Sequence, residues 1–120
     1  MSKLEDITTL TEEESTAIRK VIVKILEKFD VKRMLLFGSK ARGDFNDDSD
    51  IDVLILANEE IGIIKTWEIS DISTDIAVEC DIFVSCKIFN YSDWEGGNED
   101  KIFLPFRENV EMNGVEIEFE

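Results

Sequence analysis

Hydrophobic residues near the N-terminus recur at the spacing of a helix. Residues 11–29 carry apolar side chains three or four positions apart, which predicts a helix with one buried face. Thr11 and Glu14 form a candidate capping box, because each side chain can bond the backbone N–H group of the other residue. The apolar face consists of Ile18, Ile22, Ile25 and Phe29.

The next two apolar stretches are short and nearly continuous, as in buried strands. They span residues 33–37 and 51–57, the second rich in isoleucine, valine and leucine. Between them, residues 39–42 suit one helical turn, and the glycine, asparagine, aspartate and serine content of residues 43–49 suits a loop. The pattern therefore predicts two core strands joined by an acidic connection.

The second half of the chain returns to a helical period and then to strands. Isoleucines recur near helical spacing across residues 61–78, and residues 79–86 have the composition of a third strand. A polar loop is expected at 91–100 and a short helix at 105–112, with proline in its first turn and Asn-Gly after its end. Apolar residues and glutamates alternate over 115–119, which predicts a half-exposed strand.

These elements predict the α/β (α+β) class, with a small mixed β-sheet and helices packed on it. A helix between the second and third strands acts as a crossover, so those strands are expected to be parallel. The loop at 43–49 returns the chain to the same end of the sheet, so the first strand is expected to run antiparallel to the second.

Length and composition favour one domain and exclude several kinds of site. A chain of 120 residues with 43% hydrophobic content suits a single domain over 1–120, with its core at about 11–86 and a C-terminal helix and strand at about 102–119. The absence of histidine removes serine–histidine and cysteine–histidine catalysis and most zinc sites. Cys80 and Cys86 are too far apart along the predicted strand for a disulfide, so reduced thiols are expected.

The net charge restricts the partners. A formal charge of −15, from 28 acidic and 13 basic residues, repels phosphate backbones, so direct binding of nucleic acid is not expected. A basic protein partner, or a nucleotide carried with a metal ion, fits this charge better. The N-terminus lacks a basic segment followed by an apolar run, and no apolar stretch is long enough to span a bilayer. We therefore expect a cytoplasmic protein that does not bind membranes.

Three aspartates are candidate metal ligands. Asp50 and Asp52 stand two positions apart at the start of the second predicted strand, so their side chains share one face. Paired carboxylates repel each other, and Mg²⁺ or Mn²⁺, which prefer oxygen ligands, would relieve that repulsion. Asp81 is expected at the same edge, with Glu79 as an alternative third ligand on the same strand face. Spacing alone does not separate such a site from a solvated turn.

A glycine–serine pair ends the first predicted strand. Gly38 permits close backbone approach, and the amides that open the following helical turn would point at an anion. Ser39 adds a hydroxyl, while Lys40 and Arg42 are available for the remaining phosphate charge. A triphosphate would rest here and be bridged to the aspartates by metal ions. By itself, however, such a dipeptide is most often an ordinary turn.

Taken together, the glycine–serine pair, ten further residues and an Asp-Ile-Asp triplet at 50–52 resemble the signature of the DNA polymerase β-like nucleotidyltransferase superfamily. Within it, the chain resembles the minimal nucleotidyltransferases (MNT). The resemblance is strongest over residues 33–57 and continues more loosely to Asp81. Lys40 stands where many members have arginine, which keeps the charge but loses bidentate geometry.

The resemblance implies an activity and a partner. Family members transfer a nucleoside monophosphate from a nucleoside triphosphate to a hydroxyl, so Asp50 and Asp52 would hold the nucleotide-bound Mg²⁺. Asp81 would help to hold a second ion and assist deprotonation of the acceptor. Minimal members commonly accompany a HEPN-domain ribonuclease toxin, and some act as its antitoxin by adenylylating a tyrosine. Transfer of AMP from ATP to such a toxin is therefore expected.

Two other functions stay open at the level of sequence. One is an antitoxin that neutralises its partner by complex formation alone. The other is transfer to a small molecule, as in aminoglycoside nucleotidyltransferases, although residues 87–120 leave little material for an acceptor domain. The sequence leaves the homo- or hetero-oligomeric state open. Trp67 and Trp94 are expected to serve packing or a partner surface and not to stack on a base.

Overall fold

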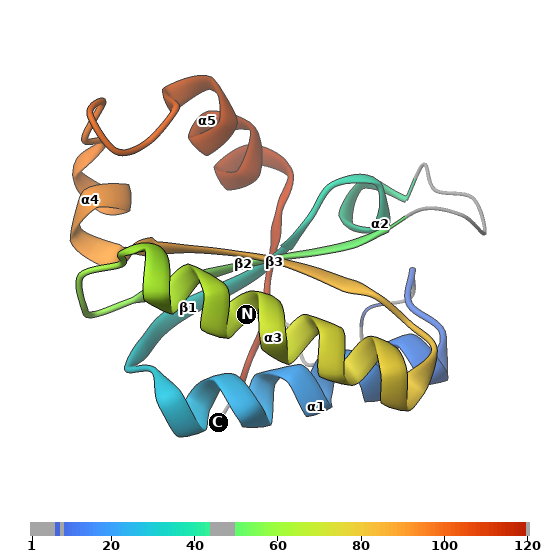
Figure 1. Ribbon diagram of the computed structural model, residues 1–120. Helices are drawn as coiled ribbons and strands as arrows, with labels where there is room; N and C mark the ends of the chain where they lie inside the picture. Colours follow the sequence, from blue (N-terminus) through green and yellow to red (C-terminus); the bar gives the residue numbers. More distant parts are fainter. Residues whose placement is uncertain (1–6, 8, 44–49, 120) are drawn as a thin grey trace.

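Four strands form one mixed sheet with helices on both of its faces (Figure 1). The computed structural model describes residue 7, residues 9–43 and residues 50–119. In the sheet the strands follow the order β3-β2-β1-β4, which confirms the predicted α/β (α+β) class with a small mixed sheet. The strands are β1 (Val31–Phe37), β2 (Ile51–Ala57), β3 (Val84–Asn90) and β4 (Val115–Glu116).

The directions of the three main strands agree with the prediction. β1 is antiparallel to β2, and β2 is parallel to β3. Phe37 at the end of β1 stands opposite Asp52 near the start of β2. On its other side, Asp52 stands opposite Ser85 in β3. These three residues form one row across the sheet.

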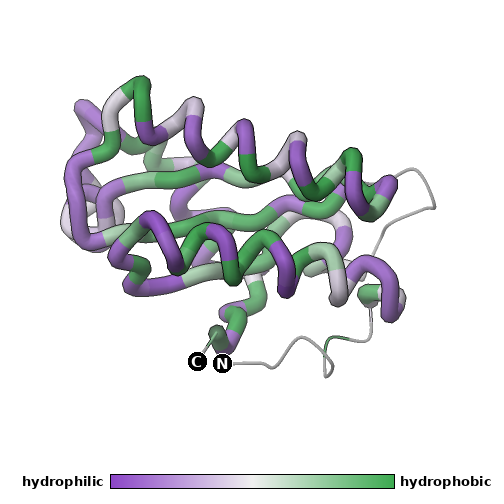
Figure 2. Tube along the Cα trace, turned by 60° about the horizontal axis from the view of Figure 1, so that its bottom comes forward, coloured by the Kyte–Doolittle hydropathy of each residue, from purple (hydrophilic) through white to green (hydrophobic). Residues whose placement is uncertain are grey.

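Two long helices close one face of the sheet. The predicted capping box opens the first of them: the N–H of Glu14 donates to Thr11 Oγ1 at 3.1 Å, and the N–H of Thr11 donates to Glu14 Oε1 at 2.9 Å. Figure 2 shows hydrophobic residues along the strands, and hydrophobic and hydrophilic residues alternating along the helices. These helices are α1 (Glu12–Lys28) and α3 (Ile63–Cys80). Their side chains in the core are Ala17, Ile18, Val21, Ile22, Ile25, Ile69, Ile72 and Ile76.

Two shorter helices lie on the opposite face (Figure 1). One confirms the helix predicted near Pro105, whereas the other replaces part of the predicted loop. The side chain of Asn90 caps this second helix by accepting a hydrogen bond from the N–H of Asp93 at 2.9 Å, and Trp94 anchors it with 0% exposure. The burial of Trp94 confirms its predicted packing role. The two helices are α4 (Tyr91–Gly96) and α5 (Leu104–Asn113).

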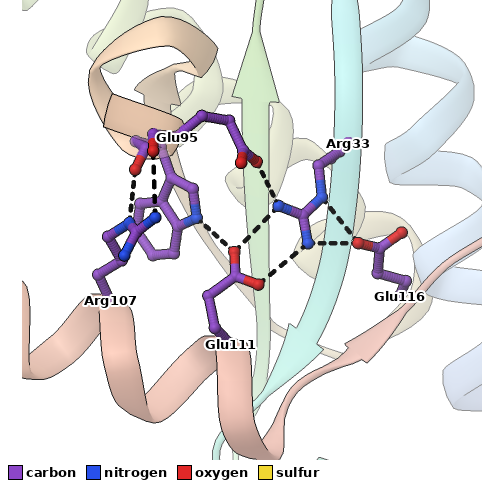
Figure 3. Close-up of polar contacts among 6 residues, drawn as sticks. Arg33, Glu95, Arg107, Glu111 and Glu116 are labelled. Atoms are coloured by element: carbon purple, nitrogen blue, oxygen red, sulfur yellow. Dashed lines mark hydrogen bonds and ion pairs between the residues drawn. The ribbon is translucent and has the colours of Figure 1, made fainter. Parts of the chain in front are cut away.

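A polar cluster around Arg33 of β1 ties α4 and α5 to the sheet (Figure 3). The guanidinium lies 2.5 Å from Glu95 of α4 and 2.9 Å from Glu111 of α5, and it also pairs with Glu116 of β4. Trp94 Nε1 donates to Glu111 at 2.7 Å. Burial disfavours the charge of Arg33, but its carboxylate partners raise its pKa above the ordinary value. Burial also opposes the charge of Glu111, yet the bonds from Arg33 and Trp94 lower its pKa.

The boundary between α3 and β3 differs from the prediction. The helix continues through Glu79 and Cys80, which were assigned to the third strand, and β3 begins only at Val84. Cys80 lies one helical turn beyond Ile76 and packs against the same core, so the helical period extends further than the polar residues suggest. Asp81 then ends the helix in a left-handed conformation with φ 57°.

The last strand is shorter than predicted. β4 pairs with β1 over only two residues, where 115–119 was expected. Beyond it, the N–H of Ile117 still donates to the carbonyl of Met34 at 2.9 Å, so the chain stays attached to β1. Cys80 and Cys86 are both free thiols, as predicted. Among the described residues, no helix is both long and apolar enough to cross a membrane.

Candidate functional site

The glycine–serine turn lies directly against Asp52. Gly38 follows β1 with φ 77° and ψ −159° and is the N-cap of the four-residue helix α2 (Ser39–Arg42). This backbone conformation is essentially restricted to glycine. A Cβ atom on Gly38 would lie 2.5 Å from Asp52 Oδ2, so only glycine allows this approach. The turn and the carboxylate are therefore in close contact, as their spacing in the sequence suggested.

The two paired aspartates differ in their surroundings. Asp52 is half-buried within β2, whereas Asp50 is exposed immediately before the strand. Because side chains alternate along a strand, Asp52 shares the sheet face of Leu54, which packs in the core under α4 and α5. Asp52 is thus held in position by strands on both sides, while Asp50 stands at the edge of the site.

Asp81 does not join this pair, which corrects the prediction that the three carboxylates converge. As the C-cap of α3, Asp81 is exposed, and its N–H donates to the carbonyl of Ala77 at 2.9 Å. Within the part of the chain that the structure describes, no three acidic or cysteine side chains are grouped to hold a metal ion. The prediction failed because the crossover helix is longer than expected, so Asp81 belongs to its end and not to β3.

The alternative third ligand, Glu79, is also engaged elsewhere. It lies in the last turn of α3 and pairs with Lys20 of α1 at 2.5 Å. The hydrogen bond and charge of Lys20 lower the pKa of Glu79. Glu79 therefore links α3 to α1 on the far side of the sheet from Asp52.

Ser85, which no sequence motif indicates, occupies the position beside Asp52 in β3. The side chain of Ser85 is half-buried and lies on the same sheet face as Asp52, because directly paired residues of neighbouring strands point to the same side. The alternation of Val84, Cys86 and Ile88 with polar residues was the available signal. The predicted strand at 79–86 ends before this alternation is complete, so the prediction did not use it.

Lys40 is placed differently from its predicted phosphate role. Its side chain is buried, with 4% exposure, and its Nζ pairs with Glu14 Oε2 at 2.9 Å. Burial opposes the charge of Glu14, but the Thr11 amide and Lys40 lower its pKa. Lys40 thus connects α2 to the start of α1. The side chain of Arg42 and most of the predicted 43–49 loop lie outside the described residues.

The donors at this site suit a hard divalent cation. Asp50 and Asp52 offer carboxylate oxygens, and Mg²⁺ is usually bound by one or two carboxylates together with substrate phosphates and water. At the start of α2 the N–H of Ala41 donates to the Gly38 carbonyl at 3.1 Å, so the N–H of Ser39 is the leading amide that remains available to an anion. The arrangement suits a metal-bound phosphate ester, with the metal on the aspartate side and the phosphate on the turn.

Comparisons with known proteins agree with this geometry. The chain matches the family model "Nucleotidyltransferase domain" over residues 18–113, which include the turn and both aspartates. It is 35% identical over 95 residues to "Putative protein adenylyltransferase MJ0141" of Methanocaldococcus jannaschii, covering 79% of this chain and 87% of that protein.

Two solved structures share the fold. One, titled "Crystal structure of the toxin-antitoxin with AMP-PNP", has a TM-score of 0.56 at 22% identity, covering 82% of this chain and 70% of that one. The other, titled "Structure of putative minimal nucleotidyltransferase", has a TM-score of 0.52 at 19% identity and covers 95% of each chain. At these identities the likeness confirms the predicted architecture.

Proposed function

The chain belongs to the nucleotidyltransferase domain family, and on that premise we propose that it transfers AMP from ATP to a hydroxyl group of a protein partner. It is a nucleotidyltransferase by family; the donor, the acceptor and the metal ion are the proposal. The contact between Gly38 and Asp52 is the observation that carries it, because a Cβ atom there would lie 2.5 Å from the carboxylate. This contact supports the proposal because the turn that would bind the phosphates lies beside the carboxylate that would bind the metal ion.

The described residues suit the binding steps of this reaction. Asp50 and Asp52 would hold Mg²⁺ or Mn²⁺, one ion or two, and the metal neutralises charge on the phosphate oxygens when bound. The amide and the hydroxyl of Ser39 would orient the triphosphate. The acceptor hydroxyl would then lose its proton to solvent, and its oxygen would bond to the α-phosphorus as the bond to the departing pyrophosphate breaks. Asp81 has no part in this proposal because it caps α3 and belongs to no group of three metal-ligating side chains among the described residues.

A protein acceptor is supported by the relatives. The match from Methanocaldococcus jannaschii carries the name of a protein adenylyltransferase, and a structural neighbour is a toxin–antitoxin complex with AMP-PNP. We therefore propose that the acceptor is a tyrosine of a HEPN-domain ribonuclease toxin and that the chain is its antitoxin. The net charge of −15 suits a basic partner surface.

Transfer of a labelled nucleotide tests the proposal. The chain and its HEPN-domain partner are incubated with ATP labelled at the α-phosphate, with and without Mg²⁺. We expect metal-dependent labelling of the partner that falls by at least about 100-fold in Asp52→Asn, the loss typical of removing a group that stabilises transition-state charge. Asp71→Asn, an exposed aspartate of α3, is the matched control. If the wild-type chain labels no partner with any nucleoside triphosphate, the enzymatic proposal is wrong.

One observation favours a second candidate function. Asp81 is not beside the pair, so the described residues supply two carboxylates to the site where three were expected. An antitoxin that acts by complex formation alone would not need a third carboxylate at this site. In this case Asp52→Asn would still neutralise the toxin in cells at matched expression, whereas an adenylylating antitoxin would lose protection with the same substitution.

A further inference from the structure

A lysine of β3 lies on the sheet face that carries Asp52, and the predicted site did not include it. Alternation along β3 places Ser85, Lys87 and Phe89 on one face. Phe89 identifies this face, because it packs against Trp94 of α4 with ring centroids 5.7 Å apart. The residues of β3 that face the core under α1 and α3 instead are Val84, Cys86 and Ile88.

The register brings Lys87 close to the candidate site. Asp52 stands directly opposite Ser85, and Leu54 stands opposite Lys87. Lys87 is therefore the diagonal neighbour of Asp52, about 8 Å away given strands about 4.8 Å apart and a rise of about 3.3 Å per residue. A flexible four-carbon stem carries the ammonium group of a lysine. Lys87 can thus reach a ligand oxygen bound beside Asp52.

The covering helices leave this lysine accessible. On the same face, Leu54 is fully buried and Phe89 is half-buried, whereas Lys87 is exposed. α4 and α5 therefore cover the sheet beside Phe89 and leave Lys87 open to solvent. Within the described ranges, no residue forms an ion pair or hydrogen bond with the side chain of Lys87. By contrast, the buried Lys40 pairs with Glu14.

We propose that Lys87 binds the β- or γ-phosphate of the nucleotide, an inference that rests on the proposed transfer from ATP. A triphosphate beside Asp50 and Asp52 adds its own negative charge to that of the two carboxylates. A metal ion held by these carboxylates would leave part of the triphosphate charge unbalanced. A cation on the same face meets that need, and charge-assisted hydrogen bonds to phosphate are the strong ones. The phosphate-binding role predicted for Lys40 passes to Lys87, because the Lys40 ammonium is held by Glu14.

A structural explanation of Lys87 makes a different prediction. β3 is at the edge of the sheet, and lysines on edge strands discourage pairing with other sheets. A lysine with only that role would affect self-association and leave nucleotide affinity unchanged. Nucleotide binding therefore distinguishes the two roles.

Calorimetric titration of the whole chain with ATP and with AMP, in Mg²⁺, tests the inference. In Lys87→Ala we expect the dissociation constant for ATP to rise roughly 10- to 100-fold, as for the loss of a hydrogen bond between charged groups. AMP lacks the β- and γ-phosphates, so its affinity should change little. Lys28→Ala removes the same charge from an exposed position in the last turn of α1 and should leave both affinities unchanged. Lys87→Arg, which keeps the positive charge, should retain most of the wild-type affinity for ATP.

The outcomes separate this inference from the proposed function. If wild-type protein binds no nucleoside triphosphate with Mg²⁺ or Mn²⁺, both are wrong. If it binds ATP and Lys87→Ala binds ATP equally well, only the role of Lys87 is wrong. An equal loss of ATP and AMP affinity would also overturn that role, since it would indicate damage to the site as a whole. If Lys87→Ala does not fold, Lys87→Arg still tests the inference. A folded arginine variant that binds ATP weakly would contradict it.

Discussion

The two faces of the sheet are covered in different ways. α1 and α3 close one face with isoleucine, valine and alanine side chains, and the strands present apolar residues to them. The other face is covered only in part, by α4 and α5, whose aromatic side chains and Arg33 cluster attach them to the sheet. The uncovered part of that face carries Asp52, Ser85 and Lys87. Incomplete cover therefore leaves polar strand positions accessible to a ligand, while the closed face provides stability.

The largest expected effect comes from substituting the glycine that touches Asp52. In Gly38→Ala the new Cβ atom would lie 2.5 Å from Asp52 Oδ2, and φ would be 77°, where alanine is strained. The carboxylate can rotate away, so we expect activity to fall more than stability. Nucleotidyl transfer should drop by at least about 100-fold.

Gly62→Ala is the matched control for this substitution. Gly62 precedes α3, has φ −108°, and has no atom within 4 Å of its Cβ position. Its transfer rate should equal that of the wild type. If Gly38→Ala keeps full activity, the Gly38–Asp52 contact is not part of the functional site.

On the closed face, substitutions should affect stability. Ile18 of α1 is completely buried, and removing most of such a side chain costs about 2–5 kcal/mol of unfolding free energy. We expect this loss for Ile18→Ala in urea unfolding, and little change for Val23→Ala, whose side chain is 53% exposed on the same helix. At a temperature where the variant remains folded, its ATP affinity should match that of the wild type. A selective loss of ATP binding would contradict the division of roles between the faces.

Much of the fold could be predicted because local patterns and tertiary packing agree. The α1 capping box, the continuous apolar run of β2 and the proline at the start of α5 are local signals, and each occurs where predicted. α4 was missed because a six-residue helix has little period to detect and depends on the burial of Trp94. β3 was misplaced because Glu79 and Cys80 suit either a helix end or a strand start.

The candidate site divides in the same way. Gly38 and Asp52 come together because they end and begin adjacent antiparallel strands, which the sequence spacing encodes. Ser85 and Lys87 depend on the register of a parallel pair, which is set by α3 and cannot be obtained from spacing along the chain. The prediction of Asp81 as the third ligand depended on a third strand that began at residue 79, whereas α3 continues to Cys80 and β3 begins at Val84.

The partly covered face should loosen when its ionic attachment is removed. Arg33→Met leaves three glutamates without their shared cation. Because these carboxylates are partly solvated, we expect a loss of only about 1–3 kcal/mol. Urea unfolding measures it, and Lys20→Met, which breaks an exposed pair with Glu79, should have no measurable effect.

Tryptophan fluorescence locates the loosening caused by Arg33→Met. The chain has two tryptophans. Trp94 of α4 is buried in the core between the sheet and α5, whereas Trp67 of α3 is 57% exposed. In a Trp67→Phe background the remaining signal reports on the partly covered face. Iodide should quench Trp94 more strongly after Arg33→Met, before global unfolding. Equal quenching with and without Arg33 would show that apolar packing alone holds these helices.

The smallest effect expected is a pH dependence of the same attachment. The bonds from Arg33 and Trp94 outweigh burial and lower the pKa of Glu111 below its ordinary 4.5. A carboxyl group with a lowered pKa in the folded state contributes stability above its unfolded pKa and loses that contribution as the pH falls through the folded value. Wild-type unfolding free energy should therefore decrease below about pH 4.5. Glu111→Gln should reduce that decrease, whereas Glu108→Gln, exposed on the same helix, should not. An unchanged acid dependence in Glu111→Gln would mean that other paired carboxylates, such as Glu14, account for the acid sensitivity.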